Sequence, residues 1–244
     1  MPLHDNRTVQ LSADAFRVLA KVSTATLTTQ LLKRGLRNTF MQGLSPLRPD
    51  KRMVGYAFTL RYVPAREDIV DREYDNASNV QRLAVEATQK DDVLAIDARG
   101  EITSAASFGH ILGARLKVRG VAGLVTDGAL RDTPQFRELD LPSYCKAAHA
   151  TTSYLLHHPV DMNVPISCGR VLVMPGDVLV GDAEGVAVIP ARMAEEVAES
   201  AYLQERMESF FLQKIERGSS IVGVYPPDEK TLAEYAEWSR RNSG

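Results

Sequence analysis

The chain has 244 residues, of which 44% are apolar and 25% charged, a composition typical of a globular protein with its own hydrophobic core. Its 29 basic and 31 acidic residues give a formal net charge of −2, which argues against binding to nucleic acid through a broad basic surface. The longest apolar runs, such as 121–125, are far shorter than the roughly 20 residues of a membrane span. We therefore expect neither nucleic acid nor a membrane among its partners.

The cysteines and the N-terminus favour a cytoplasmic location. Two cysteines, Cys145 and Cys168, are too few for a disulfide framework, so we expect both to be buried and reduced. The first residues lack the basic segment and apolar stretch of a secretory signal. We expect the protein to reside in the cytoplasm, where thiols stay reduced.

The N-terminal part of the chain predicts helices around one strand. Ser12 is placed to cap a first helix, and a second helix fits Thr24–Lys33, with Gly35 positioned to end it. Alternating apolar residues over 55–62 predict a strand. Apolar residues at helical spacing over 79–89 predict a further helix.

The middle of the chain predicts a strand, a helix and a second strand joined by short connections. The apolar runs 93–96 and 121–125 indicate buried strands, and residues 104–119 indicate a loop that opens a helix. The apolar residues expected on the inner face of this helix are Ile111, Leu112 and Leu116. This order implies a parallel crossover unit, in which ligands bind beyond the carboxyl ends of the strands. We therefore expect the loops 107–112 and 126–132 to border one crevice.

The C-terminal third predicts short strands and one long helix. The strands are expected over 170–174, 177–180 and 185–189, separated by turn residues. Residues 192–217 show helical spacing, and the polar tail from Tyr225 is expected to contact a partner subunit. No repeat or linker divides the chain, so we expect one α/β domain over residues 1–244 with helical extensions at both ends.

Arg131 and Asp132 are the first candidates for chemistry, because they follow a buried strand and a glycine turn. Arginine offers a rigid fork for a carboxylate, and aspartate offers a hard oxygen for Mg²⁺ or Mn²⁺. Side by side, the two residues are able to hold an anion and a cation next to each other. The alternative is a solvated surface pair, which has little energetic effect.

His110 is the second candidate, at the expected start of the helix after Gly109. Backbone N–H groups at a helix start suit a carboxylate or an enolate oxygen. The imidazole is able to act as a base, a metal ligand or a contact to metal-bound water. A partly buried structural histidine is the alternative, and the pair His157-His158 is read as structural.

Common cofactor and nucleophile motifs are absent from the sequence. It has no GxGxxG after a strand, no Walker loop, no HExxH, no CxxC and no GxSxG elbow. The acids near the C-terminal turns, Asp177, Asp182 and Glu184, are interpreted as turn residues rather than ligands. The remaining candidates for chemistry therefore lie in the region around residues 109–132.

The stretch from Gly109-His110 through VRGVAGLVTDGALRD, followed by VMPGDVLVGDAEGVAVIP, resembles one family. It is the family of 4-hydroxy-4-methyl-2-oxoglutarate/4-carboxy-4-hydroxy-2-oxoadipate aldolases and the regulator of ribonuclease E activity, here called RraA-like. The likeness covers about residues 20–218. It implies an α-β-β-α sandwich of the swivelling-domain type. It also implies homotrimers or homohexamers with sites between subunits, and pyruvate aldolases that need Mg²⁺ or Mn²⁺.

The aldolase motif of this family is an acidic residue, twenty intervening residues and then Arg-Asp. Arg131 and Asp132 match the pair, and residues 111–130 are the twenty between, so His110 stands at the acidic position. The resemblance implies that Asp132 holds the metal and that Arg131 binds the substrate. It implies backbone contacts from Gly109, His110, Ile111 and Leu112. A glutamate from a neighbouring subunit's late helix completes the site, and of Glu205 and Glu208 we take Glu208 as the candidate.

The leading hypothesis is a metal-dependent lyase acting on a small 2-oxo or hydroxy acid. Its most specific form is an aldolase that releases pyruvate from a 4-hydroxy-2-oxo acid, with His110 acting as a base through water and oxaloacetate decarboxylation as a further activity. Histidine at the acidic position also suits a sugar-acid dehydratase built on the same metal site. The third reading is a non-catalytic binding protein like the ribonuclease regulator, although retention of Asp132 favours an enzyme.

Overall fold

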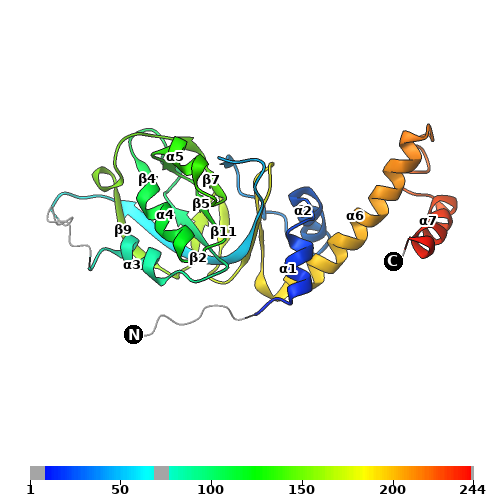
Figure 1. Cartoon of the computed structure of the whole chain (residues 1–244), viewed down its shortest axis with the longest axis horizontal. Helices are drawn as coiled ribbons and strands as arrows, with labels where there is room; N and C mark the ends of the chain where they lie inside the picture. Colours follow the sequence, from blue (N-terminus) through cyan, green and yellow to red (C-terminus); the bar gives the residue numbers. More distant parts are fainter. Residues whose placement is uncertain (1–8, 69–76, 243–244) are drawn as a thin grey trace.

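The computed structural model describes residues 9–68 and 77–242 as a mixed α/β fold with helices at both ends (Figure 1). Its helices are α1 Ala13–Leu19, α2 Thr24–Lys33, α3 Val80–Ala87, α4 His110–Val118, α5 Thr133–Glu138, α6 Ala194–Glu216 and α7 Glu229–Arg241, with the 3₁₀ turns η1 Ser153–Leu155 and η2 Ala191–Met193. Its strands are β1 Ser45–Pro46, β2 Met53–Pro64, β3 Asp92–Asp97, β4 Ala106–Phe108, β5 Gly123–Thr126, β6 Ala129–Leu130, β7 Ser143–Cys145, β8 Ala147–Ala148, β9 His157–Met162, β10 Ile166–Cys168, β11 Val171–Val173, β12 Val178–Gly181 and β13 Val186–Ile189.

The main sheet has the strand order β1-β7-β5-β3-β2-β12-β13, and β9 pairs with the later part of β2. The strands β3 and β5 run parallel, as the crossover pattern predicted, and β2 and β7 join them in the same direction, whereas β12 and β13 add an antiparallel edge. A second, three-stranded sheet contains β4, β6 and β8 in parallel. A third pairing joins β10 to β11.

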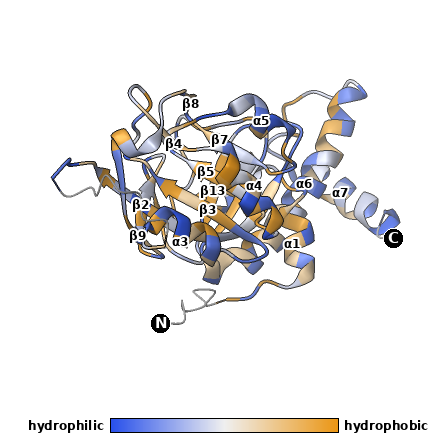
Figure 2. Cartoon of the chain, turned by 60° about the vertical axis from the view of Figure 1, so that its left-hand side comes forward, coloured by the Kyte–Doolittle hydropathy of each residue, from blue (hydrophilic) through white to orange (hydrophobic). Residues whose placement is uncertain are grey.

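The main sheet is covered on both faces, and its central strands are coloured as mostly hydrophobic in Figure 2. In β3, Leu94 and Ile96 pack into the cluster beneath α3, α4 and α5, whereas Val93 and Ala95 pack into the cluster that includes β10 and β11. This alternation follows from the two-residue period of a strand. Burial on both faces explains why these strands read as continuous apolar runs rather than as alternating ones.

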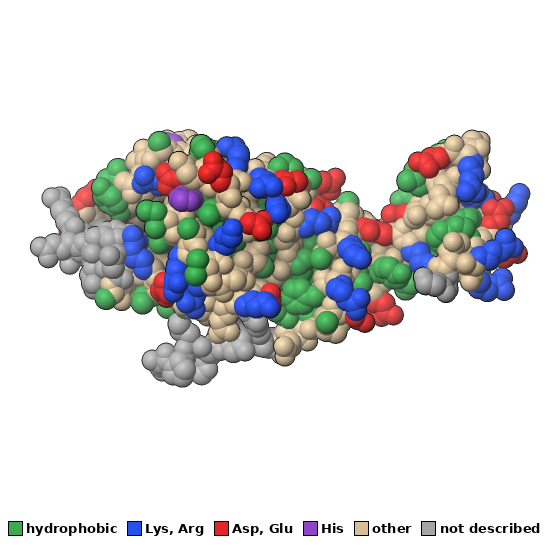
Figure 3. Space-filling model, viewed as in Figure 1, with side chains coloured by type: hydrophobic (Ala, Val, Ile, Leu, Met, Phe, Trp, Pro, Cys, Tyr) green, Lys and Arg blue, Asp and Glu red, His purple; other side chains and the backbone are tan. Residues whose placement is uncertain are grey.

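A separate hydrophobic cluster joins the two ends of the chain. Apolar residues of α1, α2 and α6 pack together against β12, β13 and Tyr56 of β2. Helix α6 then continues beyond this cluster, because its 23 residues span about 34 Å at 1.5 Å per residue. Figures 1 and 3 show that its far end and α7 project away from the body.

The projecting hairpin has a small core of its own. Phe210 and Phe211 of α6 pack with Val224, Tyr235 and Trp238 from the tail. The polar tail from Tyr225 therefore forms α7, which the sequence did not predict, and it packs against α6 of the same chain. Its contact with a partner subunit stays a prediction.

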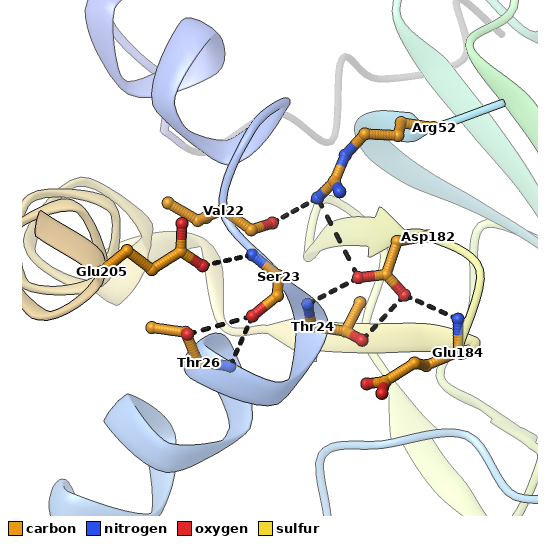
Figure 4. Close-up of polar contacts among 8 residues, drawn as sticks. All are labelled: Val22, Ser23, Thr24, Thr26, Arg52, Asp182, Glu184 and Glu205. Atoms are coloured by element: carbon orange, nitrogen blue, oxygen red, sulfur yellow. Dashed lines mark hydrogen bonds and ion pairs between the residues drawn. The ribbon is translucent and has the colours of Figure 1, made fainter. Parts of the chain in front are cut away.

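A polar network fixes the start of α2 to the turn between β12 and β13 (Figure 4). The Asp182 carboxylate accepts hydrogen bonds from the Thr24 N–H at 2.8 Å, the Thr24 hydroxyl at 2.9 Å and the Glu184 N–H at 2.9 Å. Arg52 lies 4.0 Å from this carboxylate and donates to the Val22 carbonyl. Asp182 thus acts as a turn residue, as its sequence context predicted, and its bonds to Thr24 at the start of α2 were not predicted.

The same region ties α6 to α2. The Glu205 carboxylate accepts the Ser23 N–H at 2.6 Å, and the Ser23 hydroxyl caps α2 by accepting the Thr26 N–H at 3.1 Å (Figure 4). The base of the projecting hairpin is therefore anchored by a hydrogen bond to the N-terminal helices.

Among the described residues, no helix combines the length and hydropathy of a membrane span.

Most of the predicted elements are confirmed, with close boundaries for α2, α3, α4 and β13. Cys145 and Cys168 are free and buried, as expected. The prediction that Ile111 faces inward is wrong, because its side chain is 81% exposed. Leu112 and Leu116 lie one turn apart and pack on the core, whereas Ile111 lies about 100° around the helix from Leu112.

Candidate functional site

The candidate site forms where β4 and β6 end side by side. The two strands are parallel, with Phe108 opposite Leu130, so Gly109 and Arg131 both follow at the same edge. The Arg131 N–H donates to the Phe108 carbonyl at 3.1 Å and extends this pairing. The expected crevice between the loops 107–112 and 126–132 is therefore present. It is created by the small second sheet rather than directly by the end of β5.

Asp132 has a left-handed backbone conformation, with φ +59°, directly before α5. Its carboxylate does not cap α5 and instead points to the start of α4, where Oδ2 accepts the His110 N–H at 3.2 Å. The Arg131 Nε lies 3.4 Å from this carboxylate. Aspartate tolerates this backbone conformation better than most residues, which places a partly exposed carboxylate beside a guanidinium.

Gly109 is the residue before α4, and it allows the two segments to approach closely. A Cβ atom at this position would lie 3.3 Å from Cγ and Cδ of Arg131 and 3.4 Å from Oδ2 of Asp132. A larger side chain here would need Arg131 or Asp132 to shift by a few tenths of an ångström. Glycine therefore suits the close packing beside Arg131 and Asp132, whereas its φ of −124° is open to all residues.

The N-terminus of α4 faces Asp132 with backbone donors. The first helical hydrogen bond recorded at this end runs from the Gly113 N–H to the Gly109 carbonyl. The N–H groups of Ile111 and Leu112 precede it, and such groups have no partner within their own helix. Together with the positive end of the helix dipole, they form a favourable environment for an anion.

These groups surround a cavity of about 210 Å³. It is smaller than the roughly 300–1,000 Å³ of pockets for drug-sized ligands, so it suits a small metabolite. The described residues that line it are Gln81, Arg82, Phe108, Gly109, Ile111, Leu112, Arg131, Asp132, Thr152 and Ser153. The cavity therefore contains the predicted Arg-Asp pair, the predicted glycine and the first turn of α4.

The His110 imidazole points in a different direction from its backbone N–H. Its ring packs edge-on against Phe136 of α5, with 6.2 Å between centroids and 84° between planes. It is not among the described side chains that line the cavity. Only the backbone of His110 contacts Asp132 directly in this structure.

The candidate glutamates lie on α6, apart from the cavity of their own chain. Glu205 is committed to the Ser23 N–H, whereas Glu208 accepts only a side-chain hydrogen bond from Gln204 at 2.9 Å. Glu208 is therefore a better candidate than Glu205 for a contact with the site of a neighbouring subunit. A single chain does not bring it to Arg131, so such a role needs a second copy.

Several cavity residues carry no motif and were missed in the sequence. Gln81 and Arg82 come from α3, and Thr152 and Ser153 come from the start of η1. Gln81 also holds the cavity wall, because its amide donates to the Ser107 carbonyl at 3.1 Å and to the hydroxyl of Tyr62. No local spacing signals that these residues converge, since the sheet topology brings them together.

Two further titratable residues of this half of the chain, Asp127 and His157, are turned into the interior. Asp127 is buried and accepts the Ala98 N–H at 2.8 Å, and burial raises the pKa of its carboxyl. His157 is buried beside Tyr62, and burial together with nearby Arg99 lowers its pKa to about 4. Both side chains therefore serve the packing and hydrogen bonding of the interior, as expected for His157.

The donor set fits a hard divalent cation with one protein ligand. Among the described residues, no group of three or more His, Cys, Asp or Glu side chains converges as a metal cage. Asp132 offers a partly exposed carboxylate at the cavity, and the residue at the start of α4 beside it is His110 rather than a second acid. Mg²⁺ commonly binds through one or two carboxylates and completes its shell with water and substrate, so this arrangement is compatible with it.

A larger hollow of about 680 Å³ lies between α1 and α6. Side chains of both charges line it, among them Asp14, Arg17, Lys21 and Arg206. On the face shown in Figure 3, basic and acidic side chains are also interspersed.

Comparison with known proteins identifies the family. A protein of Halalkalibacterium halodurans, provisionally named a 4-hydroxy-4-methyl-2-oxoglutarate aldolase, is 37% identical over 65% of this chain and 69% of its own length. The 4-hydroxy-4-methyl-2-oxoglutarate aldolase of Thermus thermophilus is 32% identical over 48% of this chain and 68% of its own length.

A solved structure agrees with the sequence relatives. Streptomyces coelicolor RraAS2, described as an unusual member of the RNase ES inhibitor RraA protein family, superposes with a TM-score of 0.73 at 32% identity, covering 83% of this chain and 97% of that one. The sequence profile described as RraA-like, Aldolase/RraA, matches residues 20–188, which hold the sheet, the cavity and the Arg-Asp pair. The chain belongs to the RraA-like (Aldolase/RraA) family.

Proposed function

We propose that this protein is a divalent-metal-dependent lyase that cleaves a small 4-hydroxy-2-oxo acid to pyruvate and also decarboxylates oxaloacetate. The observation that carries the proposal is the pairing of Arg131 and Asp132 in a small cavity against the N-terminus of α4. Relatives named as 4-hydroxy-4-methyl-2-oxoglutarate aldolases support this class of reaction.

Asp132 is the residue that would hold Mg²⁺ or Mn²⁺. When bound, such an ion acts as a Lewis acid for the negative charge that develops on the pyruvate fragment. The His110 N–H donates to Oδ2 of Asp132 and positions the carboxylate. The carboxylate stays partly exposed, so its oxygen atoms remain accessible to an ion.

Arg131 and the first turn of α4 bind the 2-oxo acid. The guanidinium offers paired donors to a carboxylate, and such charge-assisted bonds are about twice as strong as neutral ones. The N–H groups of Ile111 and Leu112 add donors for oxygen atoms that become more negative during bond cleavage. Ile111, whose side chain is 81% exposed, also forms part of the cavity rim.

Cleavage of the C3–C4 bond requires transfer of the proton of the C4 hydroxyl to a base, and a proton must then return to C3 of pyruvate. His110 is a candidate base through water, although its ring now contacts Phe136. Glu208 is the other candidate, delivered by a second copy of the chain. The variants His110→Asn and Glu208→Gln separate them, because only loss of the base removes the corresponding limb of the pH profile of kcat.

We propose that the protein assembles as a homotrimer or homohexamer with sites between subunits. Large apolar side chains are exposed around the cavity. Ile111 lies at its rim, and Tyr154 and Leu155 of η1, which follow the cavity residue Ser153, are each more than half exposed. The hairpin of α6 and α7 projects from the body and exposes Leu212 and Tyr225. Light scattering of the purified protein tests the assembly, and a stable monomer with full activity would contradict it.

The activity test measures pyruvate release from several 4-hydroxy-2-oxo acids and from oxaloacetate, with Mg²⁺ or Mn²⁺ and with EDTA. Release that requires the metal supports the proposal. Absence of release from all of them with either metal would overturn it. Formation of 2-oxo acids from aldonic acids in the same preparation would instead identify a sugar-acid dehydratase.

The similarity to RraAS2 favours a second candidate, a non-catalytic regulator that binds an RNA-degrading protein. Retention of an accessible Asp132 in a ligand-sized cavity is better explained by catalysis. Purified ribonuclease E-type enzyme added to the immobilised protein tests this alternative. Binding without any turnover of the acids above would establish it, and metal-dependent turnover would favour the lyase.

A further inference from the structure

A buried pair of hydroxyl groups joins the strands that carry the candidate site. Ser107 of β4 and Thr126 of β5 are both fully buried, and their side-chain oxygen atoms lie 2.9 Å apart. The Ser107 hydroxyl donates to the Ala129 carbonyl of β6 at 2.9 Å. The Gly128 N–H donates to Oγ1 of Thr126 at 3.1 Å. Because each hydroxyl has a single proton, Thr126 donates to Ser107, and one chain of hydrogen bonds links β5, β4 and β6.

The backbone carbonyl of Ser107 extends these bonds to the other wall of the cavity. It accepts the Tyr62 hydroxyl of β2 at 3.0 Å and the Gln81 amide of α3 at 3.1 Å. Gln81 lines the cavity, as do Phe108 and Gly109, the two residues that follow Ser107. Ser107 is therefore bonded to β2, α3, β5 and β6 at once.

Ser107 also lies at an irregularity in the pairing of β4 with β6. Ala106 is opposite Ala129 and Phe108 is opposite Leu130, so β4 has one residue more than β6 over this stretch. Such a bulge disrupts the backbone ladder locally, and both strands are very short. The hydroxyl of Ser107 reaches the Ala129 carbonyl at this point, so side-chain bonds supplement a ladder that is weak by itself.

We propose that Ser107 and Thr126 are positioning residues for the Arg-Asp pair. Their hydroxyl groups fix β4 against β6, and the residues that follow these strands, Gly109 and Arg131, meet at the cavity. A shift of one strand against the other changes the distance between the start of α4 and the Arg-Asp pair directly. Both hydroxyls are buried away from the cavity, so neither contacts a bound acid. The inference rests on the proposed lyase function only for its effect on turnover.

The test uses substitutions that separate the hydroxyl group from the shape of the side chain. Thr126→Val removes the hydroxyl and keeps the branched shape, whereas Thr126→Ser keeps the hydroxyl and removes a methyl group. Ser107→Ala removes the other hydroxyl of the pair. Thr59→Val is the matched control, because Thr59 is a fully buried threonine of β2 in the same sheet. Its hydroxyl donates at 2.6 Å to the carbonyl of Val164, which packs on the cluster at the opposite face of the sheet.

Stability and activity are expected to respond differently. Thr126→Val and Thr59→Val should each lower the midpoint of thermal unfolding by about 2–8 °C, because each loses a buried hydrogen bond. Of these two, only Thr126→Val should also lower kcat/KM for pyruvate release, by about 10- to 100-fold, the loss expected for a shift of about 0.5–1 Å. Thr126→Ser should lose stability through its missing methyl group and keep kcat/KM within about 3-fold.

The serine provides an independent variant of the same chain of bonds. Ser107→Ala should lower kcat/KM to a similar extent as Thr126→Val. The double variant should lie within about 3-fold of either single variant, because removal of one hydroxyl already breaks the chain. Losses that multiply in the double variant would show that the two hydroxyls act separately, and would overturn their joint role.

Hydrogen exchange measured by mass spectrometry tests the positioning without turnover. The Arg131 N–H donates to the Phe108 carbonyl at 3.1 Å, across the two strands. The peptide that contains Arg131 should exchange about 5- to 30-fold faster in Thr126→Val and in Ser107→Ala, and at the original rate in Thr126→Ser and in Thr59→Val. Unchanged exchange in the first two variants, or an equal increase in Thr59→Val, would overturn the proposal.

Failure of the lyase proposal gives a different result. In that case no 4-hydroxy-2-oxo acid yields pyruvate, while the exchange of the Arg131 peptide still decides whether the hydroxyl pair fixes the strands. Conversely, pyruvate release with full kcat/KM in Thr126→Val would retain the lyase and reject the positioning role.

Discussion

Replacement of Gly109 by alanine should reduce activity while leaving the protein folded. The new Cβ would lie 3.3 Å from Cγ and Cδ of Arg131 and 3.4 Å from Oδ2 of Asp132, so these side chains must move by a few tenths of an ångström. The backbone φ of −124° allows alanine without strain. The loss of glycine freedom in the unfolded chain stabilises by about 0.4–1 kcal/mol, which offsets the poorer helix cap of alanine.

The expected magnitudes therefore differ between stability and activity. The free energy of unfolding should change by less than about 1 kcal/mol, because the two effects oppose each other. A misplacement of about 1 Å in a site reduces rates by about 100-fold, so a shift of a few tenths of an ångström should lower kcat/KM by roughly 3- to 10-fold. Urea unfolding and pyruvate release measure the two quantities on the same preparation.

Gly113→Ala is the matched control within the same helix. Its Cβ would lie 2.5 Å from Cε1 and 2.8 Å from Cζ of Phe136, well inside contact distance, in the core beneath α4. This variant should lose roughly 1–3 kcal/mol of stability through overpacking. If Gly109→Ala also unfolds at lower urea with a loss of this size, or retains full kcat/KM, the close approach at residue 109 does not serve the site.

Three further predictions concern charge and protonation. Asp132→Asn should abolish metal-dependent turnover and weaken Mg²⁺ binding in calorimetry, while stability changes by less than about 1 kcal/mol because asparagine tolerates the left-handed backbone; retained Mg²⁺ affinity would show that the metal lies elsewhere. Arg131→Lys should raise KM by about 10- to 100-fold, because an ammonium replaces the two-donor fork, and an unchanged KM would remove Arg131 from substrate binding. His157 has a folded pKa lowered to about 4, so the unfolded chain binds its proton first as the pH falls from 6.5 to 4. Stability should therefore fall by roughly 2–4 kcal/mol across that window, and urea unfolding of His157→Phe should show a weaker dependence; an equal slope in both proteins would contradict this origin.

The sequence by itself predicted most of the elements and the Arg-Asp pair of the candidate site. Apolar runs between acids located β3 and β5, and capping residues located α1 and α2, because these signals depend on neighbours along the chain. Arg131 and Asp132 were found for the same reason, since a glycine turn after a buried strand is a local pattern. The short strands β4, β6 and β8 were missed, as two or three residues carry no measurable periodicity.

Only the tertiary structure decided what surrounds that pair. The pairing of β4 with β6 brings residue 109 to residue 131, and the sheet topology places Arg82 of α3 and Ser153 of η1 on the same cavity. The direction of the His110 ring and the exposure of Ile111 were also decided by packing, because Phe136 of a later helix occupies the side of α4 on which the imidazole packs. Such contacts join segments that are distant along the chain, so no local pattern of residues encodes them.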